Sequence, residues 1–173
     1  MRLVPSNIAH IREIMTWFPS PETCVQWGGP DMRFPFAENT FLEDIHWKKM
    51  PSYSAVTSEG QLIGFGQFYE KQGRCHLARL AVSPSCRGQG LGKKFISMLM
   101  GIGKKQLKSS GFSLYVFEHN EPAVVCYKSL GFKPAAAPKP VIKLKDCIFM
   151  IADSIESCGQ SGTMTGASTA KTG

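Results

Sequence analysis

The sequence lacks any C-x-x-C pair, although six of its 173 residues are cysteines. This absence excludes the common zinc-binding and dithiol redox motifs, and free thiols are the expected state of the cysteines. No apolar run approaches the length of a membrane span, and the opening "MRLVPSNIAHIREIM" has no apolar segment of a secretory signal peptide. We therefore expect a protein of the cytoplasm, without a metal site and without a membrane partner.

The sequence also lacks a block of five or six like charges, although its formal net charge is +7. A basic chain favours an anionic partner, which could be nucleic acid, a membrane surface or a small polyanionic cofactor. Because no helix-turn-helix, RNP or zinc pattern is present, we do not expect nucleic acid as the partner. The chain length suits one well-buried domain.

Apolar periodicity and turn residues predict alternating strands and helices, in the order β-α-α-β-β-β-α-β-α-β. A meander followed by one strand-helix-strand crossover implies an α/β fold, with a mixed, mostly antiparallel sheet flanked by helices. The expected strands are 1–4, 53–57, 62–69, 75–82, 112–117 and 141–152, and the expected helices start near 6 and span 39–49, 91–110 and 121–130. Asn39 and Asn120 are the expected N-caps of the second and fourth helices.

Two segments predict no regular structure. Residues 18–35 are rich in proline and glycine and are expected to form a loop. Residues 153–173 are rich in Gly, Ser and Thr without apolar periodicity, so we expect a flexible tail after a single domain, 1–152.

The stretch "SCRGQGLGKK" at 85–94 has the glycines and cations of a phosphate-binding loop. A P-loop aligned on Lys93 would need glycine at 87 and a hydroxyl at 94, where the chain has Arg87 and Lys94. A dinucleotide fingerprint would need its third glycine at position 93. Both of these interpretations therefore fail.

The segment does match [Q/R]-x-x-G-x-[G/A], as Arg-Gly-Gln-Gly-Leu-Gly at 87–92, after the strand-like "HLARLAVSP". A second motif follows in "LYVFEHNEPAVVCYKSLGF", with a strand, an asparagine, N-x-x-A-x-x-x-Y and L-G-F. In these two motifs, in this order, the chain resembles the GNAT superfamily of N-acetyltransferases. The resemblance covers residues 75–133 at the level of motifs.

The resemblance implies acetyl-CoA as cosubstrate. Its pyrophosphate would lie on the main-chain amides at the start of a helix, where unpaired donors and the helix dipole attract anions. Lys93 and Lys94 would add positive charge beside the phosphates. The residues implied in cofactor binding are Leu80, Ala81 and Val82 through their backbone, Arg87, Gly88, Gln89, Gly90, Leu91, Gly92 and Lys93 in the loop, and Asn120 and Tyr127 beside the pantetheine arm.

The resemblance also implies that Tyr127 is the general acid of acetyl transfer to an amine. A phenol with a pKa of about 10 is protonated at neutral pH and can donate to a thiolate whose conjugate acid has a pKa of about 8.5. Without the motif, the same residue would be interpreted as a core tyrosine on an amphipathic helix.

The general base is not assigned by the sequence. Ribosomal-protein alanine N-acetyltransferases carry a glutamate five residues before the motif asparagine, and this chain has Tyr115 there. That difference argues against assigning either the substrate or the general base of those enzymes to this protein. A water chain remains an alternative, as do four nearby side chains: Glu70, His76, Glu118 and His119.

Covalent catalysis by Cys86 or Cys126 is not expected, because no His-Cys arrangement is evident and the family transfers the acetyl group directly. The resemblance also implies that the acceptor enters beside the aromatic-rich segment that contains Trp17, Trp27, Phe34 and Phe36. Three acidic residues there could attract a cationic amine: Glu22, Asp31 and Glu38. Small amines, amino acids, antibiotics and peptide N-termini all remain open as acceptors. A homodimer is compatible with the sequence, and the alternative function is a catalytically silent acetyl-CoA sensor.

Overall fold

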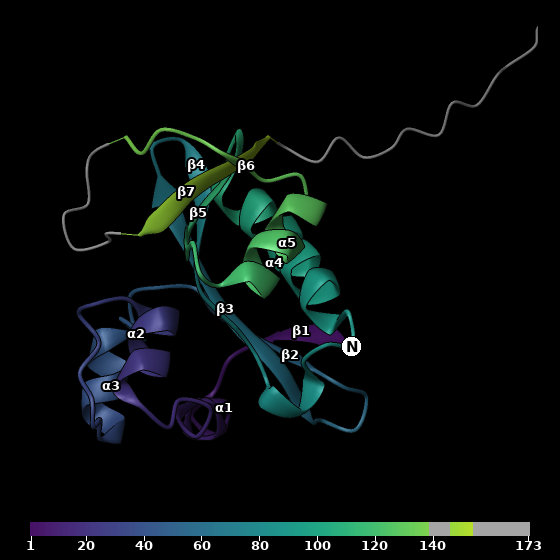
Figure 1. Cartoon of the computed structure of the whole chain (residues 1–173). Coiled ribbons are helices and arrows are strands. Elements are labelled where there is room, and N and C mark those ends of the chain that lie inside the picture. Colours follow the sequence, from purple (N-terminus) through teal and green to yellow (C-terminus); the bar gives the residue numbers. More distant parts are fainter. Residues whose placement is uncertain (139–145, 154–173) are drawn as a thin grey trace, which may run out of the picture.

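The structure is a computed structural model that describes residues 1–138 and 146–153. Its described strands form one sheet in the order β1-β2-β3-β4-β5-β7-β6 (Figure 1). The strands are β1 (Arg2–Pro5), β2 (Ser52–Val56), β3 (Leu62–Lys71), β4 (Arg74–Val82), β5 (Gly111–Phe117), β6 (Lys133–Pro134) and β7 (Cys147–Asp153). The helices are α1 (Ile8–Met15), α2 (Pro21–Gly28), α3 (Glu38–Asp44), α4 (Leu91–Leu107) and α5 (Glu121–Ser129), with a 3-10 turn at Pro84–Cys86.

Neighbouring strands run antiparallel, except that β4 and β5 are parallel. Parallel neighbours need a crossover, which α4 provides. The prediction of a mixed, mostly antiparallel sheet flanked by helices is therefore confirmed.

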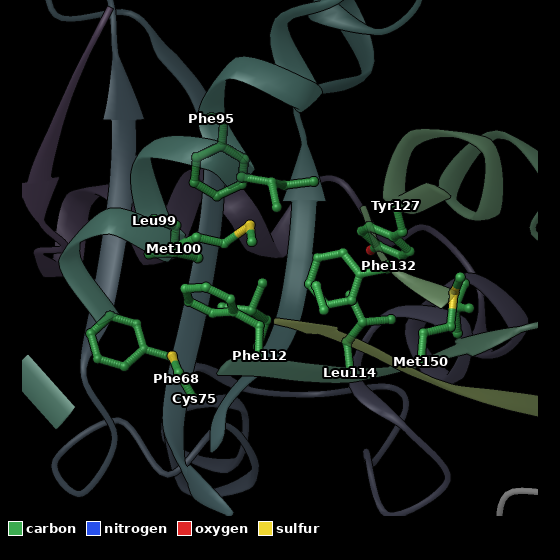
Figure 2. Packing of buried hydrophobic residues seen from close by; sticks show 14 of the residues in the cluster. Phe68, Cys75, Phe95, Leu99, Met100, Phe112, Leu114, Tyr127, Phe132 and Met150 are labelled. Atoms are coloured by element: carbon green, nitrogen blue, oxygen red, sulfur yellow. The ribbon is translucent and has the colours of Figure 1, made fainter. Parts of the chain in front are cut away.

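The sheet separates two hydrophobic clusters. Ala55 and Val56 are consecutive residues of β2 and belong to different clusters, as expected because successive side chains point to opposite faces of a strand. In Figure 1, α4 and α5 lie on one side of the sheet and α1, α2 and α3 on the other. The α4/α5 cluster contains Phe68, Phe95, Leu99, Met100, Phe112, Leu114, Tyr127, Phe132 and Met150 among others (Figure 2). The α1–α3 cluster contains Ile11, Ile14, Trp17, Phe18, Cys24, Phe41, Ile45 and Phe65 among others.

Helix α4 approaches the sheet closely at one glycine. A Cβ atom built on Gly103 would lie 2.5 Å from the Sγ atom of Cys75, whereas a Cβ atom on Gly101 would meet nothing within 4 Å. Gly103 therefore allows the helix to pack against β4, and Gly101 has no such role.

The prediction that residues 18–35 form a loop is wrong, because α2 lies within them. Ser20 caps this helix by accepting from the Thr23 N–H at 3.3 Å, and Pro21 occupies the first turn, where a missing N–H costs nothing. Cys24 is fully buried in the α1–α3 cluster and anchors the helix. A proline next to a capping serine thus begins a helix here.

Other boundaries also differ from the prediction. The N-cap of α3 is Ala37 and not Asn39, since the Thr40 hydroxyl satisfies the Ala37 N–H at 2.9 Å, and the helix ends at Asp44. The short β6 was not predicted. The last strand begins at Cys147, and residues 141–145 of the predicted strand lie outside the described residues, as do residues 154–173 of the predicted tail.

Candidate functional site

The parallel strands β4 and β5 pair only at their beginnings within the described ranges. Cys75 is opposite Phe112 and His76 is opposite Ser113, after which β4 continues to Val82 and β5 to Phe117 without further pairing to each other. An unpaired strand edge offers main-chain N–H and C=O groups to an extended ligand. Leu80, Ala81 and Val82, which the family resemblance implies in pantetheine binding, lie along this edge.

A β-bulge distorts β4 in the same region. Phe65 pairs with Ala81 and Gln67 pairs with Ala78, so that Gly66 is opposite the two residues Arg79 and Leu80. Arg79 has a positive φ of 48°. A bulge bends the strand that carries it and increases its twist, which agrees with the separation of β4 from β5.

The glycine-rich loop connects the end of β4 to the start of α4. Gly88 and Gly90 have φ values of 73° and 72°, in the left-handed region that glycine adopts readily. Gly90 is the N-cap of α4, and no side chain among the described residues makes a cap hydrogen bond to this end. Because the first turn also lacks an acidic residue, its N–H groups and the helix dipole are available to an anion.

The remaining loop residues of the predicted site are close to the same end of α4. Arg87 donates from Nε to the Val82 carbonyl at 3.2 Å, and Gln89 donates from Nε2 to the Ser85 carbonyl at 3.0 Å. These bonds tie the loop to the end of β4. Leu91, Gly92 and Lys93 form the first turn of α4.

Asn120 occupies the N-cap position of α5, but its side chain makes no cap hydrogen bond. Its main-chain carbonyl accepts from the N–H groups of Ala123 and Val124, both at 3.0 Å. The prediction of Asn120 as the N-cap is therefore confirmed for its position, but the side-chain hydrogen bond expected of a capping asparagine is not formed.

Tyr127 lies on α5 and is buried in the α4/α5 cluster, with 8% of its surface exposed. Its ring makes an edge contact with Phe132, with centroids 6.0 Å apart (Figure 2). Burial raises the pKa of the Tyr127 phenol well above its usual value of about 10, and nearby Cys126 raises it further. The phenol is therefore protonated throughout the physiological pH range.

Helix α5 lies beside the start of α4. Burial raises the pKa of the Cys126 thiol. The nearby Lys93 ammonium opposes this rise with a smaller effect. A thiol with a raised pKa contains little thiolate at neutral pH. This agrees with the expectation that Cys126 is not a nucleophile.

His76 is buried where β4 and β5 last pair. Its Nδ1 atom lies 2.9 Å from the Ser113 Oγ atom, and its ring packs between those of Tyr69 and Tyr115, with centroids 5.0 and 5.5 Å away. Burial, helped by the charge of Lys71, lowers the pKa of His76 to about 3. Such an imidazole is too weak a base to take a proton from an ammonium group.

The other candidate bases differ in their surroundings. Glu70 accepts from the Gly73 N–H at 2.6 Å in the turn between β3 and β4, and this gives it a structural role. Glu118 and His119 are exposed in the turn after β5. Tyr115 is partly buried, and the Lys71 Nζ atom lies 4.6 Å from its ring centre. No base is assigned by this geometry.

A cavity of about 300 Å³ lies beside the bulge of β4. It is lined by residues 28–32, by Glu43, Asp44 and His46, and by Arg79. We call it the Arg79 cavity. The predicted acceptor segment thus contributes its residues 28–32, including Asp31, whereas Trp17 is buried in the α1–α3 cluster and Trp27, Phe34 and Phe36 pack against it.

Two of the three acidic residues predicted near the acceptor do not line the Arg79 cavity. Arg79 itself, which does line it, was not predicted as a site residue. Glu38 is paired with Arg12 at 2.6 Å, and Glu22 lies in the first turn of α2. Arg79 gave no signal in the sequence, because a single arginine within a strand is usually a surface residue.

Within the described ranges, no group of three or more His, Cys, Asp or Glu residues is placed to hold a metal ion. No helix there has the length and apolar character needed to cross a membrane.

The family model described as Acetyltransferase (GNAT) family matches residues 13–132. The chain is 25% identical over 155 residues to an N-acetyltransferase 9-like protein of Dictyostelium discoideum. The aligned part covers 76% of this chain and 73% of that protein.

Two solved structures have similar folds. The spermidine N-acetyltransferase of Vibrio cholerae, in complex with CoA and spermine, has a TM-score of 0.67 at 16% identity, covering 88% of this chain and 94% of that one. The ribosomal-protein-S18-alanine N-acetyltransferase of Escherichia coli has a TM-score of 0.63 at 20% identity, covering 92% of this chain and 97% of that one. At these identities the likeness supports the fold.

The family match extends from the last turn of α1 to the residues after α5 and so includes the unpaired parts of β4 and β5, the glycine-rich loop and Tyr127. The prediction of an acyltransferase is confirmed. This chain belongs to the acetyltransferase (GNAT) family.

Proposed function

We propose that the protein transfers the acetyl group of acetyl-CoA to a primary amine by direct attack in a ternary complex, with Tyr127 protonating the CoA thiolate. The observation that carries the proposal is the separation of β4 from β5 beside the uncapped start of α4. A strand-like arm and an anionic group at its end would fit these two features together.

In this proposal the diphosphate lies on the N–H groups of the loop and of the first turn of α4, near Arg87 and Lys93. The pantetheine arm runs along the edge formed by Leu80, Ala81 and Val82, where a main-chain N–H would stabilise the developing oxyanion. The proximity of Lys93 to Cys126 supports this arrangement, because it brings α5, and with it Tyr127, beside the start of α4.

The chemistry requires a neutral amine. Its nitrogen attacks the thioester carbon, the C–N bond forms, and the C–S bond then breaks to release CoA as a thiolate. The Tyr127 phenol donates its proton to the sulfur, and the proton lost by the amine returns through solvent to the phenolate. The products are an N-acetylated amine and CoA with a free thiol.

Acceptors of two classes are compatible with this reaction. The name of the Vibrio cholerae structure specifies a polyamine, and that of the Escherichia coli structure specifies an alanine of a ribosomal protein. Both are primary amines, which supports a small amine or a peptide N-terminus as the acceptor class of this protein.

The experiment combines calorimetry with an assay of thiol release over a library of amines. Acetyl-CoA should bind without any acceptor present. Tyr127→Phe should lower turnover by about 10²- to 10⁴-fold, the usual contribution of a general acid, while the Kd for acetyl-CoA changes less than about twofold. Unchanged turnover of Tyr127→Phe would refute the acid role, and absence of acetyl-CoA binding would refute the proposal as a whole.

Tyr53→Phe is the matched control for this substitution. Tyr53 lies on β2, where its hydroxyl is bonded to Gln106 at 2.6 Å and its ring stacks on Phe68. The same chemical change is thus made away from the unpaired parts of β4 and β5. Turnover of this variant should remain close to that of the unsubstituted protein.

A further inference from the structure

Arg79 is a partly buried cation whose hydrogen-bond partners carry no charge. Its Nη1 atom donates to the Gln67 Oε1 atom at 3.1 Å, and its Nη2 atom donates to the main-chain oxygen of Asp44 at 2.8 Å. Its Nε atom is buried without a hydrogen-bond partner in the described part of the chain. No ion pair of Arg79 occurs among the described residues. The charge of this guanidinium is therefore not matched by a contacting anion.

The nearest carboxylate is engaged elsewhere. Asp44 accepts from Arg33 at Nε and Nη2, at 3.0 and 2.7 Å, and also from the Arg33 main-chain N–H at 3.0 Å. Burial tends to raise the pKa of Asp44, but these hydrogen bonds more than offset it and the pKa is lowered. Asp44 acts on Arg79 through space, yet burial remains the larger effect and lowers the pKa of Arg79. An anionic group placed against Arg79 would offset the free-energy cost of this desolvation.

The Arg79 cavity has room for such a group. Its volume of about 300 Å³ is at the lower end of the range for small-molecule sites, which suits a ligand of a few heavy atoms better than a large one. Asp31, Glu43 and Asp44 also line it, so that charges of both signs surround the space. A zwitterion complements such a lining better than an amine or a carboxylate alone.

The position of Arg79 connects the cavity to the chemistry. Arg79 and Leu80 are the two bulge residues opposite Gly66, and Leu80 is the first of the three residues proposed to hold the thioester arm. An anionic group bound by Arg79 and an amine presented to the thioester would therefore be held by neighbouring residues of one strand. One small molecule can carry both groups.

We propose that the acceptor is an amino acid, or a similar small molecule in which a primary amine and a carboxylate are a few bonds apart, and that Arg79 binds the carboxylate. This inference rests on the proposed function, and it narrows the acceptor to one chemical class. The product is the corresponding N-acetyl amino acid, formed together with CoA.

The first test uses the unsubstituted protein and acceptors in matched pairs. Each amino acid is compared with the amine that remains when its carboxylate is removed: phenylalanine with phenethylamine, lysine with cadaverine, and arginine with agmatine. Thiol release should give a kcat/KM at least about tenfold higher for the carboxylated member of the preferred pair, as expected for a charge-assisted contact. Equal values, or a preference for the amines, would overturn the inference.

The second test uses Arg79→Gln and Arg79→Lys. Arg79→Gln should raise the KM for the amino acid about tenfold or more and leave the KM for the matched amine and the Kd for acetyl-CoA nearly unchanged. Arg79→Lys should recover part of the preference, because it restores the charge. A structural role alone would affect both acceptors equally, and that result would overturn the inference.

Binding measurements separate this inference from the proposed function. Calorimetry of amino acids against the protein saturated with CoA should detect binding that the matched amines lack. If acetyl-CoA binds while no amino acid binds or reacts preferentially, only the inference fails. If acetyl-CoA does not bind, the proposed function fails and the inference fails with it. The matched acceptor pairs decide the question even if an Arg79 variant does not fold.

Discussion

His76 should make the stability of this fold depend on pH between about 6.5 and 3. The imidazole is 4% exposed, and its Nδ1 atom is 2.9 Å from the Ser113 Oγ atom at the last pair between β4 and β5. The pKa of His76 is about 3 in the folded protein, against 6.5 for the imidazole in an unfolded chain. Below pH 6.5 the unfolded chain therefore binds a proton that the folded protein does not. Stability is lost as the pH falls from 6.5 toward 3.

The size of this effect follows from the two pKa values. At about pH 5 the unfolded chain gains roughly 2 kcal/mol from protonation of this one histidine, because each pH unit below 6.5 is worth about 1.4 kcal/mol. The folded protein gains almost nothing, since its pKa lies two units lower than that pH. The free energy of unfolding should thus fall by about 2 kcal/mol from this residue alone.

Urea unfolding at several pH values measures the effect. His76→Phe places an aromatic ring between Tyr69 and Tyr115 without a titratable group, and its unfolding free energy should lose about 2 kcal/mol less than that of the unsubstituted protein. Ser113→Ala is the control. It removes the hydrogen bond and costs about 1 kcal/mol at each pH. It keeps the buried imidazole, so the unfolding free energy should change with pH as it does in the unsubstituted protein. An unchanged slope in His76→Phe would refute the reasoning.

Two further predictions concern other positions. Gly103→Ala should lower the free energy of unfolding by about 1–3 kcal/mol, because its new Cβ atom would press on the Cys75 Sγ atom, whereas Gly101→Ala on the same helix should raise it by up to about 1 kcal/mol. Chemical denaturation measures both, and equal effects would contradict this account of the packing. Cys126→Ala should keep turnover within about twofold of that of the unsubstituted protein. Burial keeps the thiol protonated, and a protonated thiol is not a nucleophile. A tenfold loss in the thiol-release assay would instead indicate a covalent intermediate.

The elements with strong local signals could be predicted closely from the sequence. The helix expected at 91–110 is Leu91–Leu107, and the strand expected at 112–117 is Gly111–Phe117. Apolar periodicity over many residues and glycines at the turns define these elements locally. The parallel pairing of β4 and β5 followed from the same pattern, because a helix between two adjacent strands implies a crossover.

The parts that depend on distant contacts could not be predicted. The eight residues of α2 are too few for a clear helical period, and the fully buried Cys24 gains its partners only when α2 packs on the sheet. Arg79 becomes buried because β4 bulges and because α3, thirty-five residues earlier in the chain, presents the Asp44 carbonyl to it. Neither the bulge nor this contact has a local signal.

The separation of the two hydrophobic clusters by the sheet has a consequence for how this enzyme could be redesigned. The helices α1, α2 and α3 pack on one face, and α4 and α5, which we propose to lie beside the bound acetyl donor, pack on the other. Residues on the first face can therefore be exchanged in a combinatorial library while the second face keeps its packing intact. A set of variants with new amine selectivity and a common, unaltered affinity for the acetyl donor is the expected yield of such a library.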